Sequence, residues 1–290
     1  MLLLQLLVNG VQAGAMYALI AVGFSLIFGS TRVFHFAHGA TFTIAAYLFY
    51  HFYSVAQLHW VLAVLIAAAG AVAFGAAMDR WVYAPIQRHE GSFFTVFVAS
   101  LGAGIVVQNV IGMVFGRGFV SVSTPLSMSI EIIPGLFVSP LSGIAILCAL
   151  VFFAALQVFL MRTHMGMGLR ALSENPDLVR IYGLSPRRLS TIVFALGSLL
   201  VVPAAILGAA STGLNPAIGH HIVLVSLAAT IVGGVGSLRG AACAGLLLGL
   251  SENLALIYLG SQWSEAVTFV VLFLFILFRP AGFFGRATVS

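Results

Sequence analysis

Apolar runs of about 20 residues recur along this whole chain, and they constrain its fold more than any other feature. Hydrophobic residues make up 61% of the 290 residues and charged residues only 7%, whereas soluble domains carry about 25% charged residues. The pattern contains no polar half that would form a separate soluble domain. The sequence therefore predicts an all-α, polytopic helical bundle in a membrane, formed by a single domain over residues 1–290.

Eight or nine membrane segments are expected. Candidate spans cover residues 12–29, 36–55, 59–79, 93–115, 137–160, 189–210 and 264–278, with a composite region at 222–258. Loops 80–92 and 162–188 both carry arginine and are separated by two spans, so the preference of arginine for the cytoplasm places both loops there and the N-terminus outside. The same preference places Arg279 and Arg286 inside only if region 222–258 forms two pieces. A broken or re-entrant helix is predicted there.

The twelve basic residues are all arginine. A Walker-type nucleotide site needs a lysine in its phosphate loop, and the glycine run at 233–240, GGVGSLRG, lacks one. We therefore expect no ATP hydrolysis, no enzyme activity and no bound cofactor in this chain. The net charge of +5 is carried near span ends, where membrane orientation explains it without a nucleic-acid partner.

One long polar segment, which we call the polar island, runs from Arg162 to Arg188. It holds five of the twelve arginines and two of the seven acids. Its local pattern predicts a short helix. Asn175 is suited to cap a helix that begins at Pro176, and Gly183 is suited to end it. Ser185 and Pro186 then repeat the start signal for the next helix. A folded cytoplasmic segment of this kind suggests a docking site through which another protein moves the membrane helices.

Few residues in the apolar segments can carry chemistry. On a helix, the spacing of three residues would place His35 and His38 on one face, but no nearby Cys, Asp or Glu completes a metal set. We therefore expect no metal site and assign these histidines to a translocation path or to structure. Glu252 and Asn253 interrupt an apolar helix. An ionisable residue within a membrane span usually marks a functional site, so we assign this pair to the translocation path. Interhelical hydrogen bonding is the alternative role for this pair.

Small residues recur at four-residue spacing in two places. Ala241, Gly245 and Gly249 form one stripe, and Gly10 and Gly14 form another near the first span. Such stripes allow close approach of helix backbones in a membrane. Packing within one subunit is favoured over a subunit interface.

Four stretches resemble one protein family. They are GAMYALIAVGFSLIFGSTRVFHFAHG at 14–39, RTHMGMGLRALSENPDLVRIYGLSP at 162–186, VGGVGSLRGAACAGLLLGLSENL at 232–254 and LFRPAGFFG at 277–285. In this order they resemble the permease subunits of bacterial ABC importers for branched-chain amino acids, specifically the H-type permease. The family commonly has Asn before FAHG, where this chain has His35.

The resemblance implies an ATP-driven importer of branched-chain or other hydrophobic amino acids in the bacterial inner membrane. Its implied partners are a homologous M-type permease, two cytoplasmic ABC ATPase subunits, a periplasmic substrate-binding protein and membrane lipid. Segment 162–188 would then be the cytoplasmic coupling loop. The residues expected to couple to the ATPase are Arg170, Ser173, Glu174, Asn175, Asp177, Arg180 and Gly183.

Two other functions remain open from the residues alone. A glycine-rich bundle with few polar groups also suits a passive channel for small amides such as urea. An ion-coupled carrier that works alone is the third reading. The structured cytoplasmic island favours the importer, because a channel or lone carrier needs no docking site for an ATPase.

Overall fold

The computed structural model describes residues 1–89, 91–181 and 183–284 of the protein. Arg286 therefore lies outside the described residues. The elements are α1 (Leu2–Thr31), α2 (His38–Phe49), α3 (Trp60–Ala77), α4 (Ala84–Arg88), α5 (Phe93–Phe115), β1 (Ile130–Ile133), β2 (Leu136–Val138), α6 (Pro140–Arg162), α7 (His164–Glu174), α8 (Pro176–Ile181), α9 (Pro186–Ser211), α10 (Ile218–Gly233), α11 (Leu238–Ala255) and α12 (Ser264–Phe278). Two π-helical segments, Tyr50–Val55 and Met78–Tyr83, continue α2 and join α3 to α4.

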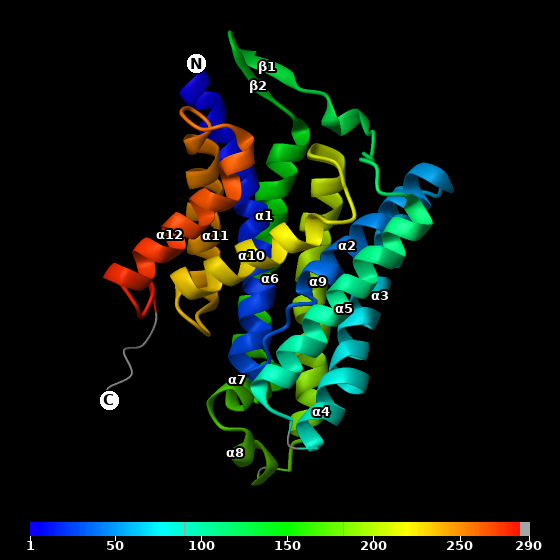
Figure 1. The fold of residues 1–290 in the computed structure, drawn as a ribbon, viewed down its shortest axis with the longest axis vertical. Coiled ribbons are helices and arrows are strands. Elements are labelled where there is room, and N and C mark those ends of the chain that lie inside the picture. Colours follow the sequence, from blue (N-terminus) through cyan, green and yellow to red (C-terminus); the bar gives the residue numbers. More distant parts are fainter. Residues whose placement is uncertain (90, 182, 285–290) are drawn as a thin grey trace.

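The long helices run roughly along the longest axis of the molecule (Figure 1). The N-terminus and the small antiparallel hairpin β1–β2 lie at one end, and α4, α7 and α8 lie at the other. We call these the hairpin end and the α8 end. Helix α10 crosses obliquely through the middle of the bundle. The fold is thus a helical bundle with one short hairpin at its end.

Six helices are long and apolar enough to cross a membrane, which supports a multi-pass membrane protein. They span Leu2–Thr31, Trp60–Arg88, Phe93–Phe115, Pro140–Arg162, Pro186–Ser211 and Ser261–Phe278. The predicted composite region consists of two helices, α10 and α11, joined by residues 234–237. Because α2, α10 and α11 fall outside the six, these lengths do not confirm a count of eight or nine segments.

Two predicted boundaries are wrong. The first span was placed at 12–29, but α1 begins at Leu2, because its early polar residues have partners on other elements. Gln5 exchanges two hydrogen bonds of 2.8 Å with the backbone of Phe137 in β2, and Gln12 accepts one from Ser142. Residues 80–88, predicted as loop, instead continue the third span as helix. Proline in the first turn of α4 is compatible with this continuation.

Two parts of the chain share one order of elements. Helix α1, link 32–37 and short α2 have the same order as α9, link 212–217 and short α10. The two long helices are antiparallel and meet where Gly23 and Gly197 each approach the other's carbonyl oxygen. Gly39 of α2 and Gly219 of α10 meet in the same reciprocal way. Glycine therefore allows close backbone contact between the two long helices and between the two short ones.

The two predicted glycine stripes pack against each other. Gly14 of α1 and Gly249 of α11 face each other across the interface between these helices, and a Cβ atom on Gly249 would overlap the Gly14 backbone. Gly245 meets the α1 backbone at Ala18 one turn away. The stripes therefore close an interface within this chain, as predicted.

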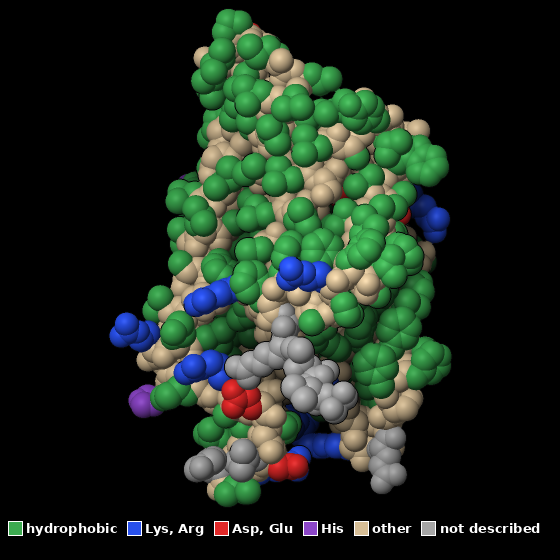
Figure 2. Space-filling view, turned by 90° about the vertical axis from the view of Figure 1, so that its left-hand side faces the viewer, with side chains coloured by type: hydrophobic (Ala, Val, Ile, Leu, Met, Phe, Trp, Pro, Cys, Tyr) green, Lys and Arg blue, Asp and Glu red, His purple; other side chains and the backbone are tan. Residues whose placement is uncertain are grey.

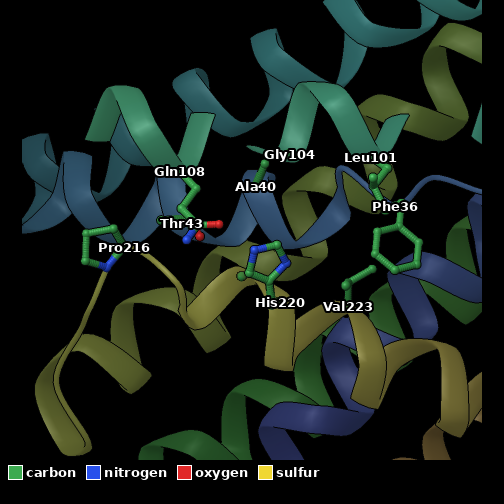
Figure 3. Close-up of a pocket in the computed structure, with 10 residues that line it drawn as sticks. Phe36, Ala40, Thr43, Leu101, Gly104, Gln108, Pro216, His220 and Val223 are labelled. Carbon is green, nitrogen blue, oxygen red and sulfur yellow. The ribbon is translucent and has the colours of Figure 1, made fainter. Parts of the chain in front are cut away.

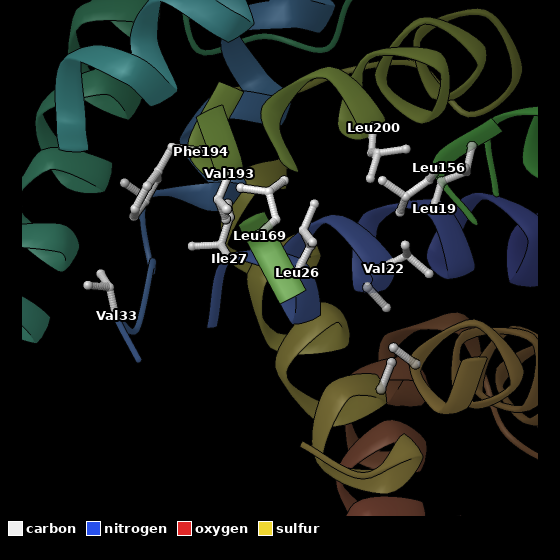
Figure 4. Packing of buried hydrophobic residues seen from close by; sticks show 14 of the residues in the cluster. Leu19, Val22, Leu26, Ile27, Val33, Leu156, Leu169, Val193, Phe194 and Leu200 are labelled. Carbon is white, nitrogen blue, oxygen red and sulfur yellow. The ribbon is translucent and has the colours of Figure 1, made fainter. Parts of the chain in front are cut away.

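Apolar side chains of α1, α6, α7 and α9 interdigitate towards the α8 end (Figure 4). Leu169 of α7 is buried among Leu26 and Ile27 of α1 and Val193 of α9. Leu172, one turn later on α7, is buried as well. This packing attaches α7 to the long helices.

Candidate functional site

The predicted short helix of the polar island is present as α8. The side-chain Oδ1 of Asn175 accepts a hydrogen bond from the Asp177 backbone N–H at 2.9 Å. Gly183 adopts a left-handed conformation with φ of +76°, and its N–H donates to the Arg180 carbonyl at 3.0 Å. Ser185 caps α9, which begins at Pro186. The predicted start and stop of this helix are confirmed, whereas its role in coupling stays a prediction.

Helix α8 exposes most of its polar side chains at the end of the molecule. Asp177 and Arg180 form an ion pair of 3.2 Å, with side chains 82% and 70% exposed. An exposed pair of this kind contributes only about 0.5 kcal/mol to folding. Ile181 is 77% exposed, although it is a large aliphatic residue. Val179 is buried and anchors the helix. The geometry leaves an apolar and charged surface available to a partner.

The other predicted coupling residues lie on or near α7. Arg170 and Glu174 are exposed, and Ser173 is half-buried with its hydroxyl donating to the Arg170 carbonyl at 2.7 Å. Arg170 and Ser173 also line a hollow of about 250 Å³. Residues 236–239, where the chain enters α11, line the same hollow. The predicted coupling residues therefore gather at the α8 end.

A polar cavity of about 590 Å³ opens near the hairpin end. Its walls come from α1, α6, α9, α10 and α11 and from the turn before α12, and they bring together amide, hydroxyl, imidazole and carboxylate groups. The polar lining residues are Gln5, Asn9, Gln12, Tyr17, Ser127, Ser129, Ser139, Ser142, Ser211, Thr212, His221, Glu252, Asn253, Ser261 and Ser264. A second hollow of about 720 Å³ between α3, α6 and α9 has an almost wholly apolar lining and offers few groups to orient a polar solute.

Glu252 is the chemical centre of the polar cavity. This residue is 5% exposed, and its carboxylate accepts hydrogen bonds from the hydroxyls of Tyr17, at 2.8 Å, and Thr268. His221 Nε2 lies 3.8 Å from the same carboxylate. A buried carboxylate needs such partners because desolvation penalises its charge. Glu252 thus connects four helices and also lines the cavity. Its interhelical hydrogen bonds are present, whereas its assignment to a translocation path stays a prediction.

Asn253 lines the same cavity, and its amide donates to the Gly249 carbonyl at 2.9 Å. The structure therefore brings Glu252 and Asn253 together at one cavity. His221 and Tyr17 complete this group, although no local pattern indicates that Tyr17 would meet an acid 235 residues away.

His35 and His38 lie elsewhere, fully buried in the middle of the bundle. His38 Nε2 donates to the Ile20 carbonyl at 3.1 Å, and its ring packs edge-on against Phe24. His35 Nδ1 lies 2.8 Å from the Tyr83 hydroxyl. Their assignment to a translocation path stays a prediction. Within residues 1–89, 91–181 and 183–284, no group of three or more His, Cys, Asp or Glu side chains is placed to hold a metal ion.

A small cleft lies beside these histidines, between α2, α5 and α10 (Figure 3). Gln108 of α5 points towards Thr43 of α2, and His220 of α10 lies between them and Phe36. This cleft of about 20 Å³ has room for only about one water molecule. Its polar groups lie where the two short helices meet.

Comparison with known proteins assigns the chain to a family. Residues 6–276 match the family described as branched-chain amino acid transport system / permease component. The high-affinity branched-chain amino acid transport system permease protein BraD of Pseudomonas aeruginosa is 30% identical, over 99% of this chain and 97% of BraD. The corresponding permease protein LivH of Salmonella typhimurium is 28% identical, again over 99% of this chain and 97% of LivH. Among solved structures, PsaBC from Streptococcus pneumoniae in complex with Fab has a TM-score of 0.49 at 14% identity, covering 97% of this chain and 91% of that chain. The chain belongs to the branched-chain amino acid transport permease family.

Proposed function

We propose that this chain is the membrane subunit of an ATP-driven ABC importer for branched-chain or other hydrophobic amino acids. It would work with an M-type permease, two cytoplasmic ATPase subunits and a periplasmic substrate-binding protein. The family of the chain and the names of its relatives support the substrate class. Because this chain has no lysine, a Walker-type ATPase must be supplied by another chain.

The observation that carries the proposal is the pairing of an exposed helix at one end with a polar cavity at the other. Helix α8 offers Ile181 and the Asp177–Arg180 pair to a partner, and buried Val179 and the packing of α7 connect it to the bundle. The cavity around Glu252 opens at the opposite end. A partner that moves α8 would therefore move the walls of this cavity.

Charge distribution supports an orientation with the α8 end in the cytoplasm. Most arginines visible in Figure 2 lie in the lower half of the molecule, towards the α8 end, whereas hydrophobic side chains dominate the upper half. Arginine favours the cytoplasmic side of bacterial inner membranes. The N-terminus would then lie outside and the C-terminus inside, with α10 and α11 as two separate pieces of a broken or re-entrant region in a total of eight or nine segments.

Substrate-stimulated ATP hydrolysis tests this function. We expect proteoliposomes that hold this chain, its M-type permease and both ATPase subunits to hydrolyse ATP faster when the binding protein and leucine are added. Leaving out this chain should abolish the stimulation. Stimulation by urea, or an unchanged rate when this chain is absent, would contradict the proposal.

Glu252→Gln tests the role of the polar cavity in transport. The amide keeps the shape of the side chain and can still pair with the hydroxyls of Tyr17 and Thr268, so thermal stability should change little. Loss of the charge at the cavity wall should lower the transport rate about tenfold. Uptake rate and melting temperature measured on the same preparation separate the two effects. Normal uptake would assign Glu252 to helix packing alone.

A further inference from the structure

Asp79 ties the third membrane span to the start of α9. It lies in the π-helical segment Met78–Tyr83 and is 4% exposed. Ser190 Oγ donates to one carboxylate oxygen at 2.7 Å, and Thr191 Oγ1 donates to the other at 2.5 Å. Both carboxylate oxygens are thus bonded to α9. Breaking these contacts would leave a buried charge without compensation, so the two elements are held in one register.

The Asp79 carboxylate also lies beside a cavity that α8 borders. Asp79 lines a cavity of about 530 Å³ together with Arg180 of α8 and Arg187 of α9. Only residues 182–185 separate α8 from α9, which begins at Pro186. Ser190 therefore lies about one turn inside the helix that α8 leads into. A displacement of α8 acts on α9 within one turn of the Asp79 contacts.

Tyr83 carries the contact from this segment to the middle of the bundle. It lies four residues after Asp79 on the same π-helical segment and is 0% exposed. Its hydroxyl donates to Ser100 Oγ of α5 at 2.8 Å and lies 2.8 Å from His35 Nδ1. Ser100 Oγ also accepts a hydrogen bond from the Ala37 N–H at 2.8 Å. Tyr83 and Ser100 thereby hold the second half of link 32–37, at His35 and Ala37.

The link ends where the two short helices touch. Helix α2 begins at His38, and its next residue, Gly39, lies against the Gly219 backbone of α10. With backbone against backbone, neither helix can shift there without moving the other. A change in the position of link 32–37 is thus passed to α10, which also supplies His221 to the polar cavity.

We propose that Asp79 and Tyr83 are positioning residues that transmit displacement of α8 and α9 to the meeting point of α2 and α10. This inference rests on the proposed importer function, because it gives the route by which an ATPase at α8 would reach the translocation path. The π-helical geometry fits the role. Single π turns within α-helices occur frequently at functional sites, where they widen the helix and aim side chains differently.

Tyr83→Phe and Asp79→Ala, assembled in the complete importer, test the route. Each should lower substrate-stimulated ATP hydrolysis and uptake about fivefold or more, and leave unstimulated hydrolysis and complex assembly unchanged. Both substitutions interrupt the same route, so the double variant should lose no more stimulated hydrolysis or uptake than the more impaired of the two single variants. Fully additive losses, or wild-type stimulation in both single variants, would overturn the inference.

Tyr47→Phe is the matched control. Tyr47 is also a buried tyrosine, 1% exposed, and its hydroxyl has no hydrogen-bond partner among the described residues. Removing this hydroxyl should leave stimulation and uptake at wild-type values. If Tyr47→Phe uncoupled the complex as Tyr83→Phe does, loss of any buried hydroxyl would suffice, and the specific route would be refuted.

Hydrogen exchange on the isolated permease separates this inference from the importer function. Asp79→Ala should raise the exchange rate of backbone amides in residues 33–41 several-fold, because it removes both contacts to α9 and loosens the segment whose Tyr83 holds that link. Tyr47→Phe should not. Unchanged protection at 33–41 in Asp79→Ala would refute the physical route even in an active importer. Faster exchange would support the route even if the complex failed to respond to leucine.

Discussion

Gly249→Ala should lower the free energy of unfolding by about 2 to 3 kcal/mol, one of the two largest effects expected from a single change in this chain. The added Cβ would overlap the backbone of Gly14, so neither helix can yield by turning a side chain. The interface affected joins α1 to α11, the helix that carries Glu252. Thermal unfolding in detergent, followed by circular dichroism, measures the loss.

Gly143→Ala is the control for this change. Gly143 lies in α6, and a Cβ built there meets no atom within 4 Å. Alanine is the better helix former by about 1 kcal/mol, so this variant should be as stable as the wild type or more stable. Equal stability of the two alanine variants would contradict the close packing of α1 on α11.

The second large effect is expected at α8. Replacing both Asn175 and Asp177 by alanine removes a helix cap worth about 1 kcal/mol and the charge that faces Arg180. Val179 still anchors the helix, so the membrane bundle should insert and fold normally. The affinity of the ATPase for the permease should nevertheless fall about tenfold, since an ordered docking helix is lost. Titration of purified ATPase onto permease in nanodiscs measures this.

Asn215→Ala controls for loss of the cap itself. Asn215 Oδ1 accepts a hydrogen bond from the Ala217 N–H at 2.9 Å, the same arrangement that Asn175 makes, but in the link before α10. Its removal should leave ATPase affinity unchanged. Equal weakening by Asn215→Ala, or undiminished affinity in the α8 double variant, would locate the docking surface elsewhere.

Local signals in the sequence predicted the elements whose causes are local. Asn175, Pro176 and Gly183 lie within one stretch of nine residues and determine the start and end of α8, so their pattern was sufficient. Close helix packing at the glycine stripes could be predicted for a similar reason. Helical spacing places Gly245 and Gly249 on one face of the helix, whatever that face contacts. The resemblance to the permease family was also local in this sense, since it rested on four continuous stretches.

Contacts between distant parts of the chain could not be predicted from the sequence. The sequence contains no mark that joins Tyr17 to Glu252 or Tyr83 to His35, because such pairs depend on how helices cross. Asp79 was a missed signal of another kind. It is an acid in an apolar helix, like Glu252, but the arginine at position 80 led to the interpretation that a loop began there. The helix instead continues through Arg88.

Uptake into vesicles tests the central claim most directly, that this chain moves amino acids only when other chains supply ATP energy. Labelled leucine should accumulate in vesicles that contain the complete complex, with ATP on the ATPase side and the binding protein on the other. Vesicles that hold this chain alone should take up none, with or without ATP. Uptake of leucine or urea by this chain alone, without ATP, would contradict the account.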